Sequence, residues 1–118
     1  MQMARFTKRV RLLKAAQFDA VFKQGRRFTI GTFTAVVASN DLGFPRVGFA
    51  FAKKHAPLSV QRNRVRRLLR ERFRQQQQAL ASVDLVLMLR SKLPQEAAAL
   101  TTLTNEFWLQ LLRRCPAS

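Results

Sequence analysis

The chain has 118 residues and carries 22 lysines and arginines against 6 aspartates and glutamates, so its formal net charge at pH 7 is +16. Because 47% of the residues are hydrophobic, the chain can bury a core, which excludes a disordered basic tail. No apolar run approaches the length of a membrane span, and the single cysteine, Cys115, excludes a disulfide framework or a zinc site built on several cysteines. These features predict one folded domain over residues 1–118, in a reducing compartment that we expect to be the cytoplasm.

The first 14 residues are rich in arginine and lysine and contain no acidic residue. Organelle transit peptides share this composition. The stretch is short, however, and it runs without a break into a predicted folded segment. We therefore favour a basic N-terminal arm over residues 1–14, ordered or in contact with RNA, over a transit peptide.

The first half of the chain predicts one helix and two strands. Residues 15–23 place three apolar side chains on one face at helical spacing, and we expect a short helix that stops at Gly25. Residues 27–39 are rich in β-branched and aromatic residues and predict one long or bulged strand. Turn-forming residues follow at 40–45, and residues 46–52 then alternate bulky and small side chains with the period of a strand. The two strands and their tight connection predict a hairpin.

The second half of the chain predicts two helices around one buried strand. Ser59 is a suitable N-cap for a helix that runs to about Leu80, with four glutamines at 75–78 on a solvated face. Residues 83–89 are almost continuously apolar, as in a strand buried on both faces. The last segment has the apolar spacing of an amphipathic helix that ends near Arg114. The predicted order is α-β-β-α-β-α, an α+β fold with helices packed against a small sheet.

The predicted central helix is unusually rich in arginine. Residues 62–74 contain seven arginines and one acidic residue, Glu71. On a helix, one arc of this segment is apolar, and a second arc forms a cationic ridge. The ridge consists of Asn63, Arg66, Arg67, Arg70 and Arg74. Arg64 lies beyond its far edge, whereas Arg62 and Arg72 flank the apolar arc.

Most arginines of the ridge lack an acidic residue to pair with. Glu71 can satisfy one of them, which we expect to be Arg67. We therefore favour anion binding over a solvated face held by ion pairs. The planar guanidinium binds phosphate with two parallel hydrogen bonds and stacks on bases, so the expected partner is a structured RNA. DNA and membrane are disfavoured, because no short helix precedes this one as in a helix-turn-helix, and because the core requires its apolar arc.

The chain offers no set of residues that could carry out catalysis by itself. Its sole histidine, His55, provides one half of an acid–base pair, and its six acidic residues lack the spacing of metal ligands. We therefore expect no catalytic residue in the protein, which disfavours a self-sufficient ribonuclease. A structural RNA-binding protein, such as a ribosomal one, is the alternative that composition leaves open.

Several motifs occur in a recognisable order. A strand beginning Arg46-Val47-Gly48 is followed by the pair Lys53-Lys54 and by a helix that opens with Arg62-Asn63-Arg64 and continues Arg66-Arg67-Leu68. Upstream, Phe18 and Phe22 form a phenylalanine pair on the predicted first helix, and an apolar strand and an amphipathic helix follow downstream. This ordered combination, which covers nearly the whole chain, resembles the protein subunit of bacterial ribonuclease P.

The resemblance implies a small α/β sandwich with a mixed sheet and an unusual left-handed crossover at the arginine-rich helix. It implies that the protein assists the Mg²⁺-dependent endonucleolytic removal of the 5′ leader from precursor tRNA, with hydrolysis left to a catalytic RNA subunit that binds most of the Mg²⁺. Metal positions on the protein are not assigned. The residues implied to bind the RNA subunit are Lys53, Lys54, Arg62, Asn63, Arg64, Arg66, Arg67, Arg70 and Arg74. Those implied to bind the single-stranded leader are Phe18, Phe22, Phe33 and Ala50.

Two features of the residues bear on the leader site. Gly48, Ala50 and Ala52 leave one face of their strand flat, so that another group can approach the backbone closely. Phe18 and Phe22 share a helix face, where they could stack on unpaired bases. Residues at this spacing are usually part of a core, and only the resemblance favours stacking.

Overall fold

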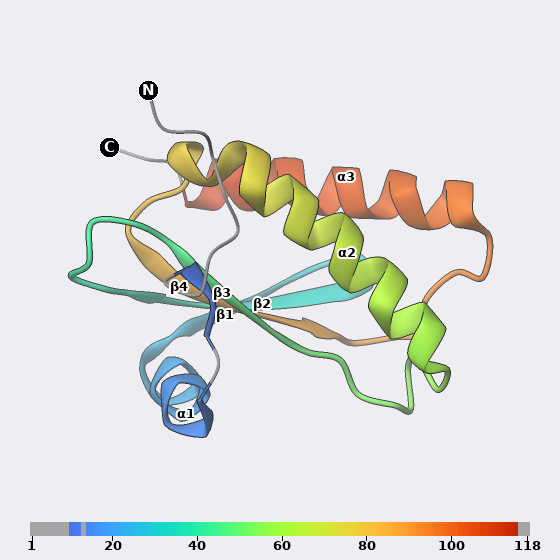
Figure 1. Cartoon of the computed structure of the whole chain (residues 1–118), viewed down its shortest axis with the longest axis horizontal. Helices are drawn as coiled ribbons and strands as arrows, with labels where there is room; N and C mark the ends of the chain where they lie inside the picture. The colour runs from blue at the N-terminus through green and yellow to red at the C-terminus, as the bar shows by residue number, and fades with distance from the viewer. Residues whose placement is uncertain (1–9, 13, 116–118) are drawn as a thin grey trace.

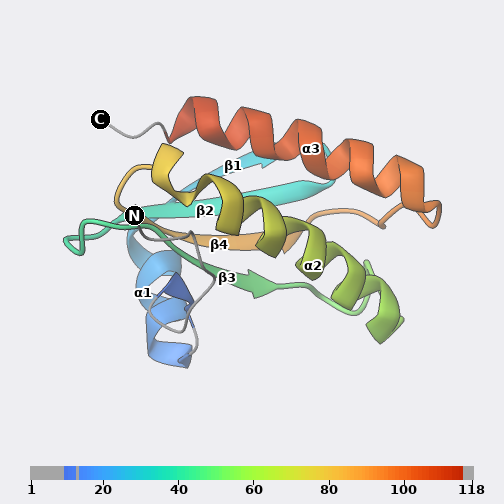
Figure 2. The same ribbon diagram turned by 45° about the horizontal axis from the view of Figure 1, so that its top comes forward.

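A four-stranded sheet carries helices on both of its faces (Figure 1). The structure, a computed structural model, describes residues 10–12 and 14–115. Its elements are α1 (Ala15–Gln24), β1 (Arg26–Ile30), β2 (Phe33–Ser39), β3 (Arg46–Ala50), α2 (Ser59–Gln76), the short 3₁₀ helix η2 (Gln77–Ala79), β4 (Val83–Leu89) and α3 (Ala97–Arg114). Helices α2 and α3 lie together on one face of the sheet, and α1 lies on the other (Figure 2). The α+β class is confirmed, with one strand more than predicted.

The strands follow the order β1-β2-β4-β3, so β1 and β3 form the two edges of the sheet. β2 pairs antiparallel with β1 and with β4, whereas β3 and β4 are parallel, which makes the sheet mixed, as expected. The chain passes from β3 to β4 through α2, so the crossover expected at the arginine-rich helix is present. Its left-handed sense stays a prediction.

The predicted long strand over residues 27–39 is wrong, because this segment forms two strands joined by Gly31 and Thr32. Gly31 has a φ of 59°. A positive φ at the first of two loop positions is the pattern of a type II′ turn, and glycine adopts it without steric cost. The tight hairpin of this fold is therefore β1–β2, with Ile30 opposite Phe33.

The predicted hairpin between the 27–39 strand and the strand over residues 46–52 is also wrong, because β4 lies between β2 and β3. Every residue of β4 except Met88 is buried. A central strand pairs along both edges and is covered on both faces, so the segment with the fewest polar side chains belongs there. The prediction of a strand buried on both faces is confirmed.

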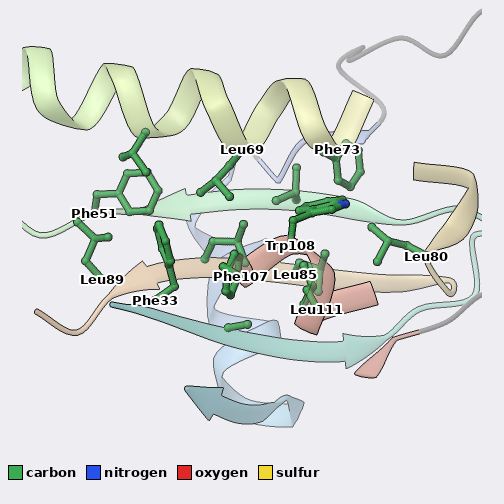
Figure 3. Close-up of a cluster of buried hydrophobic side chains, with 14 of the residues drawn as sticks. Phe33, Phe51, Leu69, Phe73, Leu80, Leu85, Leu89, Phe107, Trp108 and Leu111 are labelled. Atoms are coloured by element: carbon green, nitrogen blue, oxygen red, sulfur yellow. The ribbon is translucent and has the colours of Figure 1, made fainter. Parts of the chain in front are cut away.

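Most of the core lies between the sheet and helices α2 and α3 (Figure 3). Phe33 of β2 packs against Phe107 of α3 with ring centroids 4.7 Å apart, and Phe73 of α2 meets Trp108 of α3 edge-on at 6.5 Å. A fully buried phenylalanine contributes about 1.5–3 kcal/mol relative to an exposed one. These contacts fix which side of α2 faces the core, and therefore which side faces solvent.

A smaller cluster lies between the sheet and α1. Its buried members are Leu12, Val21, Val36, Ala38 and Val86. Phe18 of α1 lies over Gly48 of β3, where a Cβ atom would come within 2.6 Å of Phe18 Cζ. The group that approaches the flat face of this strand at Gly48 is therefore the protein's own phenylalanine.

Helices α1 and α2 begin in the same way, without a side-chain N-cap of the usual type. In each, a glutamine side chain one turn inside accepts the N–H of the residue before the helix, at 2.9 Å in α1 and 3.2 Å in α2. Ser59 is the first residue of α2 and Leu58 is its N-cap, so the predicted cap is wrong by one position. The helix ends at Gln76, before the predicted Leu80, and η2 continues the chain.

Part of the predicted basic arm packs onto the sheet, whereas residues 1–9 and 13 lie outside the described residues. Arg11 forms a parallel bridge with Val47 at the outer edge of β3, and the Leu12 N–H donates to the Val47 carbonyl at 2.9 Å. Val10 is buried in the core under α2 and α3, and Leu12 is buried in the cluster under α1. Residues 10–12 therefore cross the sheet edge from one face to the other.

Candidate nucleic-acid interface

The outward side of α2 carries arginines because its inward side is committed to the core. The buried residues of this helix are Val65, Leu69 and Phe73. With 3.6 residues per turn, Arg67 falls on the opposite side and Arg70 on the flank of the apolar arc, and both are exposed. Arg66 lies at the border between the two sides, half-buried, with its Cζ 5.8 Å from the ring centroid of Phe51. The predicted ridge is present on α2.

A fourth arginine joins this side of α2 from another part of the chain. Burial lowers the pKa of Arg70, and the positive charges of Arg11, Arg66 and Arg67 lower it further. Each of these three arginines therefore lies close enough to Arg70 for its charge to repel that of Arg70. We refer to Arg11, Arg66, Arg67 and Arg70 as the arginine cluster.

Arg11 is absent from the residues that the sequence assigned to this site. Its neighbours Val10 and Leu12 are buried on opposite faces of the sheet, and Arg11 lies between them at the edge of β3, half-buried. The apolar–basic–apolar pattern gave no signal for this crossing, because strand alternation would put Val10 and Leu12 on the same face. It could not have predicted that the segment pairs with β3 and brings Arg11 beside α2.

The charges of Arg66 and Arg67 are not offset within the protein, since neither has a carboxylate partner among the residues that the structure describes. Arg66 Nη1 donates to Asn63 Oδ1 at 3.0 Å, which orients the guanidinium without neutralising it. Arg64 is exposed as well, but two residues before Arg66 it faces the other way around the helix. The cluster can therefore accept phosphates, and Asn63 supports it.

The acidic residue of α2 pairs with a different arginine from the expected one. Glu71 accepts hydrogen bonds from Nε and Nη2 of Arg74, and this pairing lowers the pKa of Glu71 and raises that of Arg74. The expected pair with Arg67 is wrong, because the fork of Arg74 engages both carboxylate oxygens at once. Arg74 lies on the ridge as predicted, but Glu71 offsets its charge.

The remaining residues expected to bind an RNA subunit lie around the start of α2. Arg62 Nη1 donates to two carbonyl oxygens of the loop before the helix, the nearer being that of Ala56 at 2.7 Å. This half-buried arginine therefore orders the loop, and Lys53 and Lys54 are exposed in the turn that begins it. The two lysines are placed to contact an anion. Arg62, in contrast, uses its Nη1 to hold the loop before the helix.

On the α1 side of the sheet, part of the apolar face stays open to solvent. Phe18, Phe22, Ala50 and Met88 pack against the smaller cluster and remain partly exposed, and we call these four residues the aromatic surface. The guanidinium of Arg27 lies over Phe22, with Cζ 5.8 Å from the ring centroid. The two phenylalanines thus contribute to packing and also present part of each ring to solvent.

Phe33 does not belong to the aromatic surface. It is completely buried on the other face of the sheet, against Phe107. Alternate residues of a strand point to opposite faces, and β2 directs Phe33 toward α3. The expectation that Phe33 binds the leader is wrong.

The described residues hold no obvious catalytic centre. None of their His, Cys, Asp and Glu side chains form a group of three that could hold a metal ion. His55 lies in the turn before α2, where its carbonyl accepts the Leu93 N–H at 3.2 Å. The buried Asp84 accepts hydrogen bonds from Nε and Nη2 of Arg46 at 2.8 and 2.7 Å, so it serves to tie β3 to β4. No helix in the described part of the chain has the length and apolar character needed to cross a membrane.

The fold and the site define a small basic α+β protein with a crowded set of arginines on one helix. Residues 6–114 match the family model described as Ribonuclease P. Proteins named ribonuclease P protein component from Nitrosococcus oceani and Yersinia pestis are 36% and 38% identical over 114 residues, which is 96% of this chain and 96% of each relative. The chain belongs to the ribonuclease P protein family, whose members are the protein component of a ribonucleoprotein endoribonuclease in tRNA processing.

Solved structures agree with this assignment. The RNase P protein from Thermotoga maritima, in complex with 1-(4-fluorophenyl)-2-thiourea, is 26% identical with a TM-score of 0.69, over 81% of this chain and 92% of that one. A Staphylococcus aureus RNase P protein mutant with defective mRNA degradation activity is 23% identical with a TM-score of 0.75, over 91% of this chain and 88% of that one, and shows the same fold. The family resemblance expected from the sequence is confirmed, and membership implies an RNA partner.

Proposed function

We propose that this protein binds the catalytic RNA subunit of ribonuclease P through the arginine cluster and the 5′ leader of precursor tRNA through the aromatic surface. It would act in the cytoplasm as the subunit that assists Mg²⁺-dependent removal of the leader, which gives the mature 5′ end of the tRNA. The observation that carries the proposal is the set of arginines on one helix face without a carboxylate partner at Arg66 or Arg67 among the described residues, with the pKa of Arg70 lowered by burial and then by the charges of Arg11, Arg66 and Arg67.

Crowded guanidinium groups cost free energy in the free protein, and phosphates remove that cost on binding. Arg66 and Arg67 have no carboxylate partner among the described residues, so their charge is available to an external anion. Each guanidinium can bind one phosphate with two parallel hydrogen bonds. A folded RNA presents phosphates at close spacing and is repelled by a second RNA, so the cluster both anchors the RNA subunit and reduces repulsion of the precursor tRNA.

The aromatic surface suits a single strand better than a duplex. Phe18 and Phe22 present parts of their rings to solvent, and stacking of an unpaired base on an aromatic side chain contributes about 1–3 kcal/mol. A duplex hides the faces of its bases, so such a surface selects an unpaired segment. The 5′ leader is the single-stranded part of a precursor tRNA, and a leader held here would be placed relative to the bond that is cut.

Bond cleavage is assigned to the RNA partner. The described His, Cys, Asp and Glu side chains form no group of three that could hold a metal ion, and the sole histidine, His55, provides one half of an acid–base pair. Mg²⁺ held mainly by the RNA supplies the activation of water and the stabilisation of the leaving oxygen. The work of the protein is to bind and to position.

Reconstitution tests this function directly. The RNA subunit is mixed with precursor tRNA at low Mg²⁺ with wild-type protein, with the double variant Arg66→Gln/Arg70→Gln, or without protein, and release of the leader is followed. We expect the wild type to support cleavage and the double variant to lose most of this support. Arg113→Gln is the control, because Arg113 is exposed in the last turn of α3 and lies outside the arginine cluster. Cleavage by nuclease-free protein alone, or RNA binding without any effect on cleavage, would overturn the proposal.

A second pair of variants tests the leader site. Phe18→Ala/Phe22→Ala should weaken binding of leader-bearing precursor tRNA and leave binding of mature tRNA unchanged. A folded double variant that retains the wild-type preference for leader-bearing tRNA would remove the aromatic surface from the proposal while leaving the arginine cluster in place.

A further inference from the structure

A groove of about 620 Å³, which contains no residue of the arginine cluster, opens at the end of the sheet where β1 begins and β2 ends. It lies between the start of β1, the end of β2 and the C-terminal end of α3. Its lining includes Arg26, Arg27 and Arg114, together with Phe28 and the buried thiol of Cys115. The volume is in the range of ligand sites in proteins and is large enough for a nucleotide.

The charge of this groove is entirely positive. None of its eleven lining residues is aspartate or glutamate. The three arginines are exposed, and within the described residues none of them has a carboxylate partner. Arg114 is held in place instead by Phe28, with its Cζ 4.9 Å from the ring centroid. A guanidinium supported on an aromatic ring keeps its hydrogen-bond donors free for an anion.

Arg27 connects the groove to the aromatic surface. It lines the groove, and its guanidinium also lies over the ring of Phe22. Because β1 is an edge strand, no further strand separates the two sites there. A single strand of RNA that leaves Phe22 can therefore continue past Arg27 around the sheet edge and bring its phosphates to Arg26 and Arg114.

We propose that the groove at the start of β1 binds the phosphates of the 5′ leader upstream of the nucleotides held on the aromatic surface. This inference rests on the leader site proposed above. It makes the leader contact bipartite, with bases stacked at Phe18 and Phe22 and the backbone held by Arg26 and Arg114. The competing explanation is that these arginines only keep the exposed β1 edge from pairing with other chains, a role that charged edge residues commonly have.

The test measures binding of precursor tRNAs with no leader, a short leader and a long leader to the holoenzyme reconstituted with the RNA subunit. The variant is Arg26→Gln/Arg114→Gln, which removes two charges and retains most of each side-chain stem. Arg113→Gln is the matched control, because Arg113 is exposed on the same last turn of α3 but does not line the groove. Arg27 is left intact, because it touches the aromatic surface.

We expect the double variant to bind the long-leader substrate about five- to tenfold more weakly, as for the loss of exposed charge-assisted contacts, with no change for the short leader or mature tRNA. The salt dependence for the long leader should also become shallower, by about 0.7 in slope for each lost phosphate contact on a single strand. Arg113→Gln should match the wild type. Should Arg114→Gln reduce folding by exposing Phe28, Arg26→Gln alone gives the same comparison, since no aromatic ring packs on it in the described structure.

An equal loss for all substrates would overturn the inference, because the groove would then contact the RNA subunit or the tRNA body. No loss for any substrate would overturn it as well and would favour protection of the strand edge. A failure of the leader site itself is distinguishable: the wild type would then bind long-leader and mature tRNA equally well. If the wild type prefers the leader and only the phenylalanine variants remove this preference, the leader site stands and the groove does not.

Discussion

Replacing Arg11 with glutamine tests whether the arginine cluster acts as one phosphate-binding surface. Arg11 comes from the N-terminal segment, whereas Arg66, Arg67 and Arg70 come from α2, and the four meet because residues 10–12 pair with the edge of β3. The substitution leaves the backbone bridge to Val47 intact, since that bridge uses main-chain atoms. Because Arg11 is half-buried, the unfolding free energy of the variant is measured beside RNA binding, so that a loss of packing is separated from the loss of the guanidinium charge.

The expected magnitude follows from counting charges. If each guanidinium of the cluster contacts one phosphate of a duplex, each contributes about −0.9 to the slope of log K against log salt concentration. Arg11→Gln should make the slope shallower by about 0.9, so the ratio of wild-type to variant affinity should fall about 3.5-fold between about 50 and 200 mM salt. The loss of affinity itself is reduced by one effect: without Arg11, the pKa of Arg70 rises and the free protein is less strained by like charges.

The assay is a binding titration of the RNA subunit at several salt concentrations. Arg113→Gln is the control, because it removes the same charge from an exposed position at the end of α3. We expect a shallower slope for Arg11→Gln than for Arg113→Gln. Identical slopes for the two variants would show that the RNA senses only net charge, and an Arg11→Gln slope equal to that of the wild type would remove Arg11 from the interface.

Three further variants address packing, pairing and pH. Gly48→Ala places a Cβ within 2.6 Å of Phe18 Cζ, so urea unfolding should show that the free energy of unfolding falls by about 1–3 kcal/mol. Adding Phe18→Leu should restore part of this loss. A Gly48→Ala variant as stable as the wild type would contradict this packing. Glu71→Gln removes the acid that offsets Arg74, so RNA-subunit affinity should rise and its salt dependence should steepen; an unchanged slope would place Arg74 outside the interface. Burial raises the pKa of the Cys115 thiol in the folded protein. Above about pH 8.5 the thiol therefore loses its proton more readily in the unfolded chain than in the folded protein. As the pH rises, the unfolding free energy of the wild type should fall relative to that of Cys115→Ala. A difference in unfolding free energy that does not change with pH would contradict a buried thiol.

Local pattern was sufficient to predict most of the elements but not their arrangement in the sheet. The run over residues 83–89 and the amphipathic last helix are long and regular, so their type followed from periodicity. Gly31 was the only signal that the segment over residues 27–39 turns back on itself, and a single glycine is equally compatible with a bulge. The pairing of β2 with β4 joins residues far apart in sequence, and residue spacing within one segment does not predict which strands pair.

The sequence predicted which face of the central helix carries the arginines. It did not predict which arginine pairs with Glu71, or that Arg11 joins the cluster. Helical spacing correctly put Arg66, Arg67 and Arg70 together. Helical spacing could not predict that Glu71 would pair with Arg74 and not with Arg67, since residues three and four apart on a helix are both within reach. Nor could it find Arg11, whose place depends on a contact between the chain start and β3.

The N-terminal segment links the two surfaces that the proposed function requires. Val10 is buried with the core under α2 and α3, and Leu12 is buried under α1, where its Cβ lies 2.9 Å from a Cβ built at Gly48. Arg11, between them, belongs to the arginine cluster at the sheet edge. The same three residues therefore support the helix face proposed to bind the RNA subunit and the strand over which Phe18 lies. With the RNA subunit and the leader bound as proposed, the width of the sheet edge would set the separation between them.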